Sequence, residues 1–341
     1  MLTFFLAMNK QIYISIILII SVLFISSCDN TSTVGPKIDE SKLKETNVKI
    51  HRYGKKLFQI DTLDFIEGVE KIHDEFTLFL GTDISNPTKL QPLYEFVTDT
   101  HLISISKKVI EIYPNLGDLE IELSDAMSRY EYFFPKYNTP AVYSYISNLY
   151  HEKPIIIDDS IIIIALDVYL GEDYEPYRSL GLPYYIIRRM TSDNISVDVM
   201  KEIYNTELDP HHKQKTLIDR MVSSGKLLYY LDAVLPNVSD SIKIGYTSNQ
   251  MHWIENNKTN VWGFLVDNKL FYSADYKIQS NLIKDAPFTS GFSKESPPRL
   301  GSWLGWQIVR RYMDRYPDTS LQSLIDNKDS QEIFNRSGYK P

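Results

Sequence analysis

Residues 155–164 read IIIDDSIIII, two runs of isoleucine on either side of the turn residues 158–160. Each run is too short for a helix, and two β-branched runs around an Asp/Ser turn are typical of a β-hairpin. Neither run alternates with polar residues, so we expect one face of the hairpin to be packed and the other at least partly covered. Residues 141–147 are also rich in tyrosine and β-branched residues, and together these stretches predict a small antiparallel sheet.

Helical periodicity flanks this sheet on both sides. Between residues 62 and 135, apolar side chains recur at spacings of three and four, which predicts three helices. Helices return after residue 183: Thr216 opens one, the capping box from Thr247 to Gln250 opens another, and Pro297-Pro298 precedes a third. Helices, a small sheet and helices in that order predict a mostly helical α+β fold. The periodic residues of the three early helices are Leu63, Ile66, Val69, Phe76 and Leu80, then Leu93, Phe96, Val97 and Ile103, then Leu119, Leu123, Met127, Tyr130 and Phe134.

The composition narrows the class of protein. The chain has 341 residues, with 36 basic and 44 acidic side chains and a net charge of −8. An acidic chain without a long basic run argues against nucleic acid as the main partner, because phosphate binding needs clustered cations. Cys28 is the single cysteine, which excludes an intrachain disulfide and a cysteine-rich metal site.

The start of the chain has the features of a targeting signal. An uncharged apolar run over 12–25 follows Lys10 and precedes small residues, which is the order of a secretory signal. The run is shorter than the roughly 20 residues that span a bilayer comfortably. Residues 25–28, ISSC, resemble a bacterial lipobox, which implies cleavage before Cys28 and attachment of acyl chains such as palmitate to that residue. A plain signal peptide followed by a buried cysteine is the alternative.

This targeting signal determines the expected domain boundaries. We predict a lipoprotein signal peptide over 1–27 and a lipidated, flexible tether over 28–47, because residues 29–47 are polar and nearly free of large apolar side chains. Residues 48–341 then form a single helix-rich domain.

Motifs with a known chemical mechanism are missing from the sequence. There is no phosphate-binding loop, no GxGxxG, no GxSxG nucleophile elbow and no HExxH. His73 falls on the apolar face of a predicted helix, which favours a buried or boundary histidine over a ligand. We therefore predict no catalytic residue, no metal and no cofactor, although a Ser–His–Asp site assembled only in space would escape this search.

Two features stand out as candidate binding or packing surfaces. The first lies on one helix, where two glycines four residues apart imply close approach of another group, since each glycine costs about 1 kcal/mol against alanine. The second is the irregular stretch 281–298, and such loops often carry function. Tight packing inside the protein is the alternative for both features. The residues concerned are Gly301, Trp303, Gly305 and Trp306 on the helix and Phe288 and Phe292 in the loop.

Several long motifs resemble those of the GldB family of gliding-motility lipoproteins, in order and over nearly the whole chain. They are the lipobox, DVYLGEDY at 167–174, KTLIDRMVSSGKLLYYLDAVLP at 215–236, IKIGYT at 242–247, DAPFTSGF at 285–292 and PPRLGSWLGWQIVRRYM at 297–313. The resemblance implies a cell-envelope lipoprotein required for surface gliding, associated with the machinery that secretes and moves adhesins.

The family is also distantly similar to zincin-like peptidases, which hold zinc with HExxH and a downstream glutamate. Here YYIIRRM at 184–190 stands roughly where the metal helix would follow the sheet, and Ser223-Ser224-Gly225 stands at a position like that of the downstream acidic ligand. Neither offers the ligands. The resemblance therefore implies a peptidase-like scaffold without its metal site, a pseudo-peptidase that binds without cutting.

The resulting hypothesis is a non-enzymatic lipoprotein, anchored to a membrane and facing the periplasm, that binds other envelope proteins of the gliding machinery. The alternatives are an envelope peptidase or wall-acting hydrolase with an unrecognised site, and a ligand-capture lipoprotein. The family resemblance further implies O-linked glycans at Asp-Ser/Thr-apolar triplets. We expect Ser241, in a connection between helices, to be modified first, Ser160, in the hairpin turn, second, and Thr62, as a helix cap, last.

Overall fold

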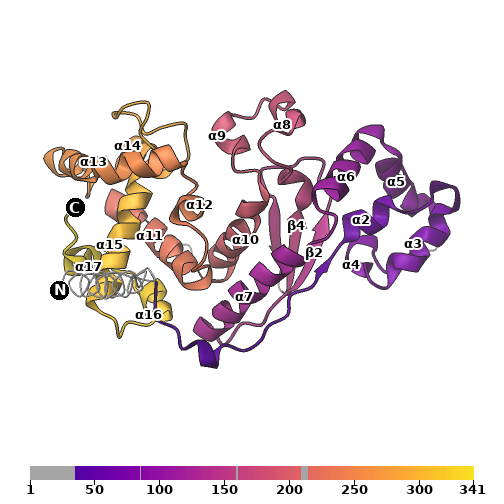
Figure 1. Ribbon diagram of the computed structural model, residues 1–341, viewed down its shortest axis with the longest axis horizontal. Helices are drawn as coiled ribbons and strands as arrows, with labels where there is room; N and C mark the ends of the chain where they lie inside the picture. Colours follow the sequence, from indigo (N-terminus) through magenta and orange to yellow (C-terminus); the bar gives the residue numbers. More distant parts are fainter. Residues whose placement is uncertain (1–34, 85, 159, 209–213) are drawn as a thin grey trace, which may run out of the picture. The chain divides into compact units, whose positions relative to one another are not determined.

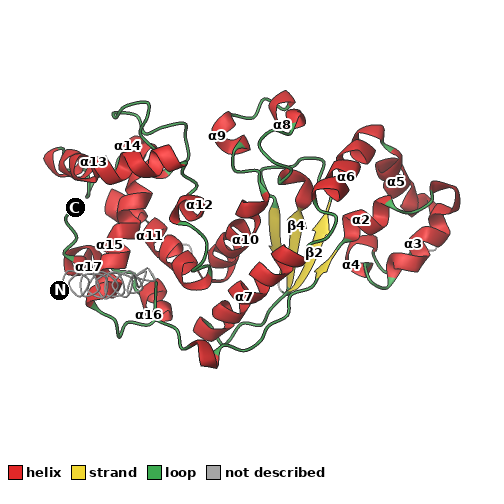
Figure 2. Cartoon of the chain, in the orientation of Figure 1, coloured by secondary structure: helices red, strands yellow, loops and turns green. Residues whose placement is uncertain are grey.

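The isoleucine-rich stretch forms the predicted hairpin. In the computed structural model, which describes residues 35–84, 86–158, 160–208 and 214–341, strands β3 (Ile155–Asp158) and β4 (Ile161–Ala165) pair antiparallel. Ile162 and Ile164 of β4 are fully buried. Figure 1 shows the path of the chain and Figure 2 shows the strands among the helices that dominate the fold.

The sheet as a whole is mixed, so the prediction of an antiparallel sheet is wrong beyond the hairpin. Its strand order is β1-β2-β4-β3, with β1 (Ile50–His51) and β2 (Ala141–Tyr145) parallel to each other and β2 parallel to β4. Parallel neighbours need a long crossover, and the helices between residues 53 and 133 provide one between β1 and β2.

The connection from β2 to β3 explains the second parallel pair. The chain leaves β2, passes beyond β4 to the sheet edge, and returns through the hairpin. Asp167, which follows β4 and is fully buried, holds this connection: its carboxylate accepts from the backbone N–H of Ser147 at 2.9 Å and of Leu149 at 2.7 Å. Burial raises the pKa of the Asp167 carboxyl, and these hydrogen bonds oppose that rise.

The helical stretch before β2 is divided more finely than the apolar period predicts. The predicted helix through residues 93–103 breaks at Asp99, whose side chain caps the next helix by accepting from the N–H of Leu102 at 2.9 Å. Leu63, which the period places inside, is 90% exposed. The elements are η1 (Glu40–Lys42), α2 (Tyr53–Phe58), η2 (Thr62–Asp64), α3 (Phe65–His73), α4 (Thr77–Leu80), α5 (Pro87–Thr98), α6 (Thr100–Ile112) and α7 (Gly117–Phe133).

The structured chain begins before the predicted domain boundary at residue 48. Glu40, in η1, pairs with Arg129 of α7 at 3.0 Å. The backbone N–H of Thr46 donates to the Ser128 hydroxyl on the same helix at 3.2 Å. Residues 40–46, predicted to belong to a flexible tether, therefore contact α7.

The helices after the hairpin start where the sequence predicts. Thr216 and Asp219 form a capping box at the start of α11, and Thr247 and Gln250 form another at the start of α13. The elements are η3 (Leu166–Val168), α8 (Glu175–Ser179), α9 (Tyr184–Ile187), η4 (Ser192–Asn194), α10 (Ile195–Ile203), η5 (Tyr204–Leu208), α11 (Leu217–Val234), α12 (Asp240–Ile244), α13 (Ser248–Asp267), α14 (Tyr276–Ile283), α15 (Leu300–Arg315), α16 (Leu321–Asp326) and α17 (Ser330–Ser337).

The glycine face of α15 packs against α11. A Cβ atom on Gly305 would lie 1.7 Å from the carbonyl oxygen of Met221, and a Cβ atom on Gly225 would lie 2.2 Å from the carbonyl oxygen of Gly305. The two backbones therefore cross in direct contact. Gly301 faces α14 instead, where a Cβ atom would lie 3.0 Å from the Leu282 carbonyl oxygen.

The two tryptophans of α15 are buried in the core rather than presented to a partner. Trp306 donates its indole N–H to Asp232 at 2.9 Å, and the guanidinium of Arg310 stacks over its ring at 3.7 Å. Asp232 is fully buried and also pairs with Lys243 at 3.0 Å. Trp303 is 1% exposed. This face of α15 is therefore a packing face.

Candidate functional site

A cavity of about 520 Å³ lies against α10 and collects charged side chains from distant parts of the chain. It is bounded by the segment that leads into β3, by η3, α9, α10 and α11, and by the two ends of the loop between α14 and α15. Its lining residues are His151, Glu152, Lys153, Pro154, Ile155, Val168, Tyr169, Ile186, Arg189, Met190, Asp198, Lys201, Glu202, Asn205, Leu227, Asp285 and Arg299.

Helix α10 supplies the polar floor of this cavity. Asp198, Lys201 and Glu202 follow the spacing i, i+3, i+4, which places them on one face of α10, and Asn205 follows in η5. The other residues of α10 are buried, and all of them except Ser196 are apolar. A helix that buries one face in the core thus turns a charged stripe towards a cavity.

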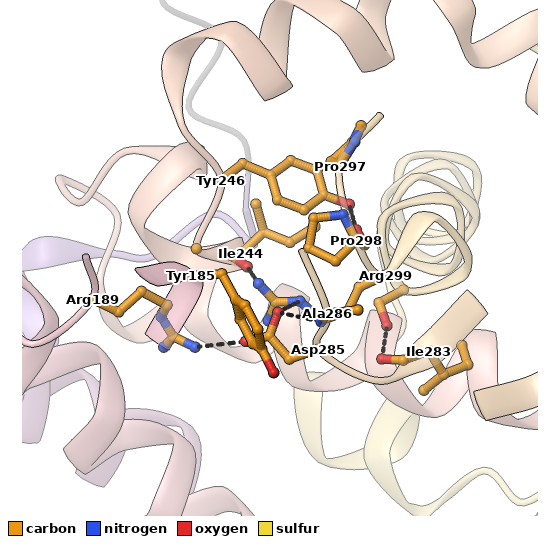
Figure 3. A network of polar contacts seen from close by, with 12 residues as sticks. Tyr185, Arg189, Ile244, Tyr246, Ile283, Asp285, Ala286, Pro297, Pro298 and Arg299 are labelled. Carbon is orange, nitrogen blue, oxygen red and sulfur yellow. Dashed lines mark hydrogen bonds and ion pairs between the residues drawn. The ribbon is translucent and has the colours of Figure 1, made fainter. Parts of the chain in front are cut away.

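Two carboxylates and three cations of the site contact one another, and we call these five residues the inner set. Arg189 pairs with Asp198 at 3.1 Å and approaches Asp285 at 4.0 Å. Arg299 lies 3.6 Å from Asp285, and the Lys201 ammonium lies 3.9 Å from Asp198. Figure 3 shows Arg189 and Arg299 converging on Asp285 from two different segments. Apart from the contact between Arg189 and Asp198, these ion pairs are longer than hydrogen bonds.

Arg299 is held in place by a strained turn. It stands immediately before α15 with φ 56° and ψ 35°, a left-handed conformation that is uncommon for a residue other than glycine. Its guanidinium donates to the carbonyl oxygen of Ile244 and lies over the Tyr246 ring at 6.0 Å, while the Tyr246 hydroxyl donates to the Pro298 carbonyl at 2.6 Å (Figure 3). These contacts fix the direction in which Arg299 points.

Lys201 has an unusual environment for an ammonium group. Its side chain is 17% exposed, and no hydrogen-bond acceptor for it is found among the described residues. Burial and, next, the charge of Arg189 lower the pKa of Lys201 from 10.5 to about 7, against the opposing effect of Asp198. A fraction of Lys201 is therefore neutral at physiological pH.

Arg188, next to Arg189, lines a neighbouring cavity of about 350 Å³ and connects the end of α9 to residues 245–250 by hydrogen bonds. It donates to the Gly245 carbonyl at 2.9 Å and to the Gln250 side chain at 3.1 Å. Segment 184–190, compared above with the metal-binding helix of zincin-like peptidases, contains one helical turn, α9. Arg188 and Arg189 follow this turn and make different contacts. Residues 223–225, compared above with a downstream ligand position, lie inside α11 at its crossing with α15.

The aromatic residues predicted as a candidate surface lie outside this cavity. Phe292 is half-buried and its ring packs edge-on against Trp253 at 6.3 Å and Phe264 at 5.0 Å. Phe288 is also half-buried. The loop between α14 and α15 thus covers part of its own aromatic side chains, and its contribution to the cavity comes from Asp285, where it begins.

Two of the three candidate glycosylation residues, Ser241 and Thr62, differ in their surroundings from the sequence prediction. Ser160 is exposed in the hairpin turn. Ser241 is half-buried within α12, not in a connection between helices, and its hydroxyl lies 2.9 Å from that of Ser239. Thr62 is exposed and is not a cap, because Asp61 caps that turn by accepting from the N–H of Leu63. Cys28 lies outside the described residues.

Sequence reasoning missed the cavity residues although two signals for them exist. The charged stripe on α10 is visible as charges at helical spacing in an otherwise apolar segment. Asp285 and Arg299 are the first and third residues of DAPFTSGF and PPRLGSWLGW, two motifs that the family resemblance already singles out.

The described ranges carry two further negative findings. Within them, no set of three or more His, Cys, Asp or Glu side chains is arranged to hold a metal ion. No helix of the part of the chain that the structure covers combines the length and apolarity needed to cross a bilayer.

Fold and site together define a mostly helical protein with a small mixed sheet and a charged, arginine-containing cavity beside it. The family model of the gliding motility protein GldB matches residues 35–341, and the chain belongs to that family, a family of lipoproteins. This match confirms the resemblance seen in the motifs. No curated protein and no solved structure matches the chain, so a zincin-like scaffold stays a prediction.

Proposed function

We propose that this GldB-family lipoprotein works by binding another component of the gliding machinery, and that it does so without catalysis. Its anchor is the acylated Cys28, and residues 35–341 face the periplasm. The single observation that carries the proposal is the charged cavity beside α10, which presents Arg189, Lys201 and Arg299 together.

The chemistry of these side chains supports binding. A guanidinium is permanently charged and offers five N–H donors, so it can hold an acceptor group but cannot shuttle protons near neutral pH. Arg299 is also fixed by the Ile244 carbonyl and the Tyr246 ring before any ligand arrives. A site whose donors are positioned in advance spends less conformational entropy on binding.

One observation favours an enzyme as the second candidate. Lys201, with a pKa of about 7, shares the cavity with Glu202. A lysine that is partly neutral near pH 7 has the proton affinity of a useful general base. A hydrolase acting on peptides or wall material is therefore the alternative. A ligand-capture lipoprotein is a third, since the cavity volume falls within the range of small-molecule sites.

Photo-crosslinking in gliding cells tests the binding role. A photoreactive amino acid replaces Glu152, which is exposed at the cavity, and a matched variant carries it at Glu70, exposed on α3. We expect a discrete adduct with one envelope protein from position 152 and none from position 70. Identical adducts from both positions, or no adduct from 152, would contradict a binding role at this cavity. Turnover of peptide or wall substrates by the purified protein, lost in Lys201→Met, would favour the enzyme instead.

A further inference from the structure

We propose that the cavity beside α10 binds the carboxylate group of a ligand with an apolar body, and that Arg189, Lys201 and Arg299 hold this carboxylate. The inference extends the proposed function by naming the chemistry of what is bound. It rests on that function only in treating the cavity as a binding site.

Among the side chains of the inner set, the cations exceed the carboxylates by one when Lys201 is protonated. Asp198 and Asp285 are the carboxylates that contact the three cations. Three cations against two carboxylates give an excess of one. Of the other charged lining residues, Lys153 and Glu152 are exposed and offset each other in charge, and Glu202 is half-buried without an ion pair among the described residues. An arriving monoanion would therefore complete the inner set.

The cations also keep hydrogen-bonding capacity that the fold does not use. Arg189 gives one terminal nitrogen to Asp198, and Arg299 gives one to the Ile244 carbonyl. The Nε atoms of both are buried, and neither finds an acceptor within the described part of the chain. With five N–H donors in each guanidinium, and with the Lys201 ammonium 3.9 Å from its nearest carboxylate oxygen, several donors are left for a ligand.

A carboxylate fits this arrangement better than a doubly charged phosphate monoester. It carries the single charge that the inner set lacks, and its planar pair of oxygens matches the fork of a guanidinium. The apolar lining from Val168, Ile186, Met190 and Leu227 suits an aliphatic body attached to the carboxylate.

Two sources can present this chemistry, namely the C-terminal end of a peptide chain and a small organic acid. Isothermal titration calorimetry at pH 7, on the full-length chain in non-ionic detergent, separates them with three probes. N-acetyl-Leu-Leu carries a free carboxylate, its C-terminal amide differs only in lacking that charge, and hexanoate lacks peptide groups. We expect the acid to bind at least roughly tenfold more tightly than the amide, since a hydrogen-bonded charge is worth about 1.5–3 kcal/mol. A preference for the peptide acid over hexanoate identifies a chain end, and equal binding identifies an organic acid.

Three variants assign the effect to the cavity. Lys201→Met should weaken binding of the acid by roughly tenfold while it raises the unfolding temperature, because it removes a charge from a buried site. Arg299→Gln should weaken binding similarly. Arg178→Gln, an exposed arginine on α8 outside the cavity, is the matched control and should bind as wild type does.

Equal affinity for acid and amide, or no binding of either, would overturn the inference. The cations would then serve only to form ion pairs between segments of the fold. If Arg299→Gln fails to fold because the Ile244 contact is lost, Lys201→Met decides alone. A stabilised Lys201→Met protein with unchanged acid affinity would also overturn it. These outcomes are independent of the crosslinking experiment, which can succeed with a partner that presents no carboxylate.

Discussion

Replacing Gly305 by alanine tests the backbone contact between α11 and α15. The added methyl group would point at the α11 backbone, 1.7 Å from the Met221 carbonyl oxygen, whereas real Cβ contacts essentially never fall under 3.0 Å. Since the obstacle is backbone and not the end of a flexible side chain, no rotamer change relieves it. The two helices must separate by roughly 1 Å or more, and Trp303 and Trp306 must follow.

The expected magnitude is the difference between two opposing effects. Removing a glycine from the interior of a helix stabilises the protein by about 1 kcal/mol. Overpacking a tight core costs about 1–3 kcal/mol and occasionally more, and a clash with fixed backbone belongs at the upper end. We therefore expect Gly305→Ala to lower the free energy of unfolding by about 2 kcal/mol.

Gly263→Ala provides the matched control. Gly263 lies in the interior of α13, and a Cβ atom there would meet nothing within 4 Å. This variant should gain only the helix-propensity term, about 1 kcal/mol. Urea denaturation at 25 °C of the two variants and the wild type measures both shifts. The difference between the two variants is then about 3 kcal/mol.

A Gly305→Ala protein that is more stable than the wild type would rule out the backbone contact between α11 and α15. If this variant is as stable as Gly263→Ala, the two helices do not cross in contact and the α15 glycines face open space. In that case the partner-groove interpretation of Gly301, Trp303, Gly305 and Trp306 would return.

Three further predictions concern the anchor, a titration and a modification. Cys28→Ser should leave the membrane fraction or accumulate as an uncleaved precursor, and wild-type fractionation and gel mobility would contradict the lipid anchor. Because the pKa of Lys201 is about 7 in the folded protein and 10.5 ordinarily, the unfolded chain binds more protons between these values and stability should rise with pH there. Urea denaturation at pH 7, 8 and 9 should show that Lys201→Met removes up to about 1.4 kcal/mol per pH unit of this slope, whereas parallel curves would disprove the shift. Intact-mass measurement of protein from its native host should show glycan mass, at Ser160 before the half-buried Ser241, and a mass equal to the lipidated polypeptide alone would end this expectation.

Local features of this fold were predictable because they depend on neighbouring residues. The helix start at Thr216, the capping box at Thr247 and the hairpin around residue 160 need only a few adjacent side chains, and all three occur where expected. The glycines of α15 likewise indicate that another part of the chain lies close to the backbone of this helix. The sequence does not say what approaches, because Gly225 and Met221 are about 80 positions away and meet α15 only in the folded chain.

Non-local features escaped prediction for the same reason. Strand β1 has two residues and pairs in parallel with strand β2, which follows the six helices α2 to α7, so no local pattern marks it. The helix predicted through residue 99 fails because an aspartate that can cap a helix there outweighs the apolar period.

The cavity shows this limit most clearly. Asp198, Asp285 and Arg299 come from three segments, and no local pattern marks any of them as a neighbour of the others. Their shared property, contact across one cavity, is produced by the packing of α10 and the loop between α14 and α15. Only the charged stripe on α10 could have indicated in advance that this helix faces something other than core or solvent.

The most direct test of the central claim, that this protein supports gliding by binding through the cavity, is the gliding speed of cells that carry Lys201→Met as their only copy. The variant protein must be present at the wild-type level in the membrane fraction, and cells with Arg178→Gln serve as the control. We expect gliding to be lost or strongly slowed with Lys201→Met and normal with Arg178→Gln. Normal gliding with Lys201→Met would show that the cavity is not needed for gliding.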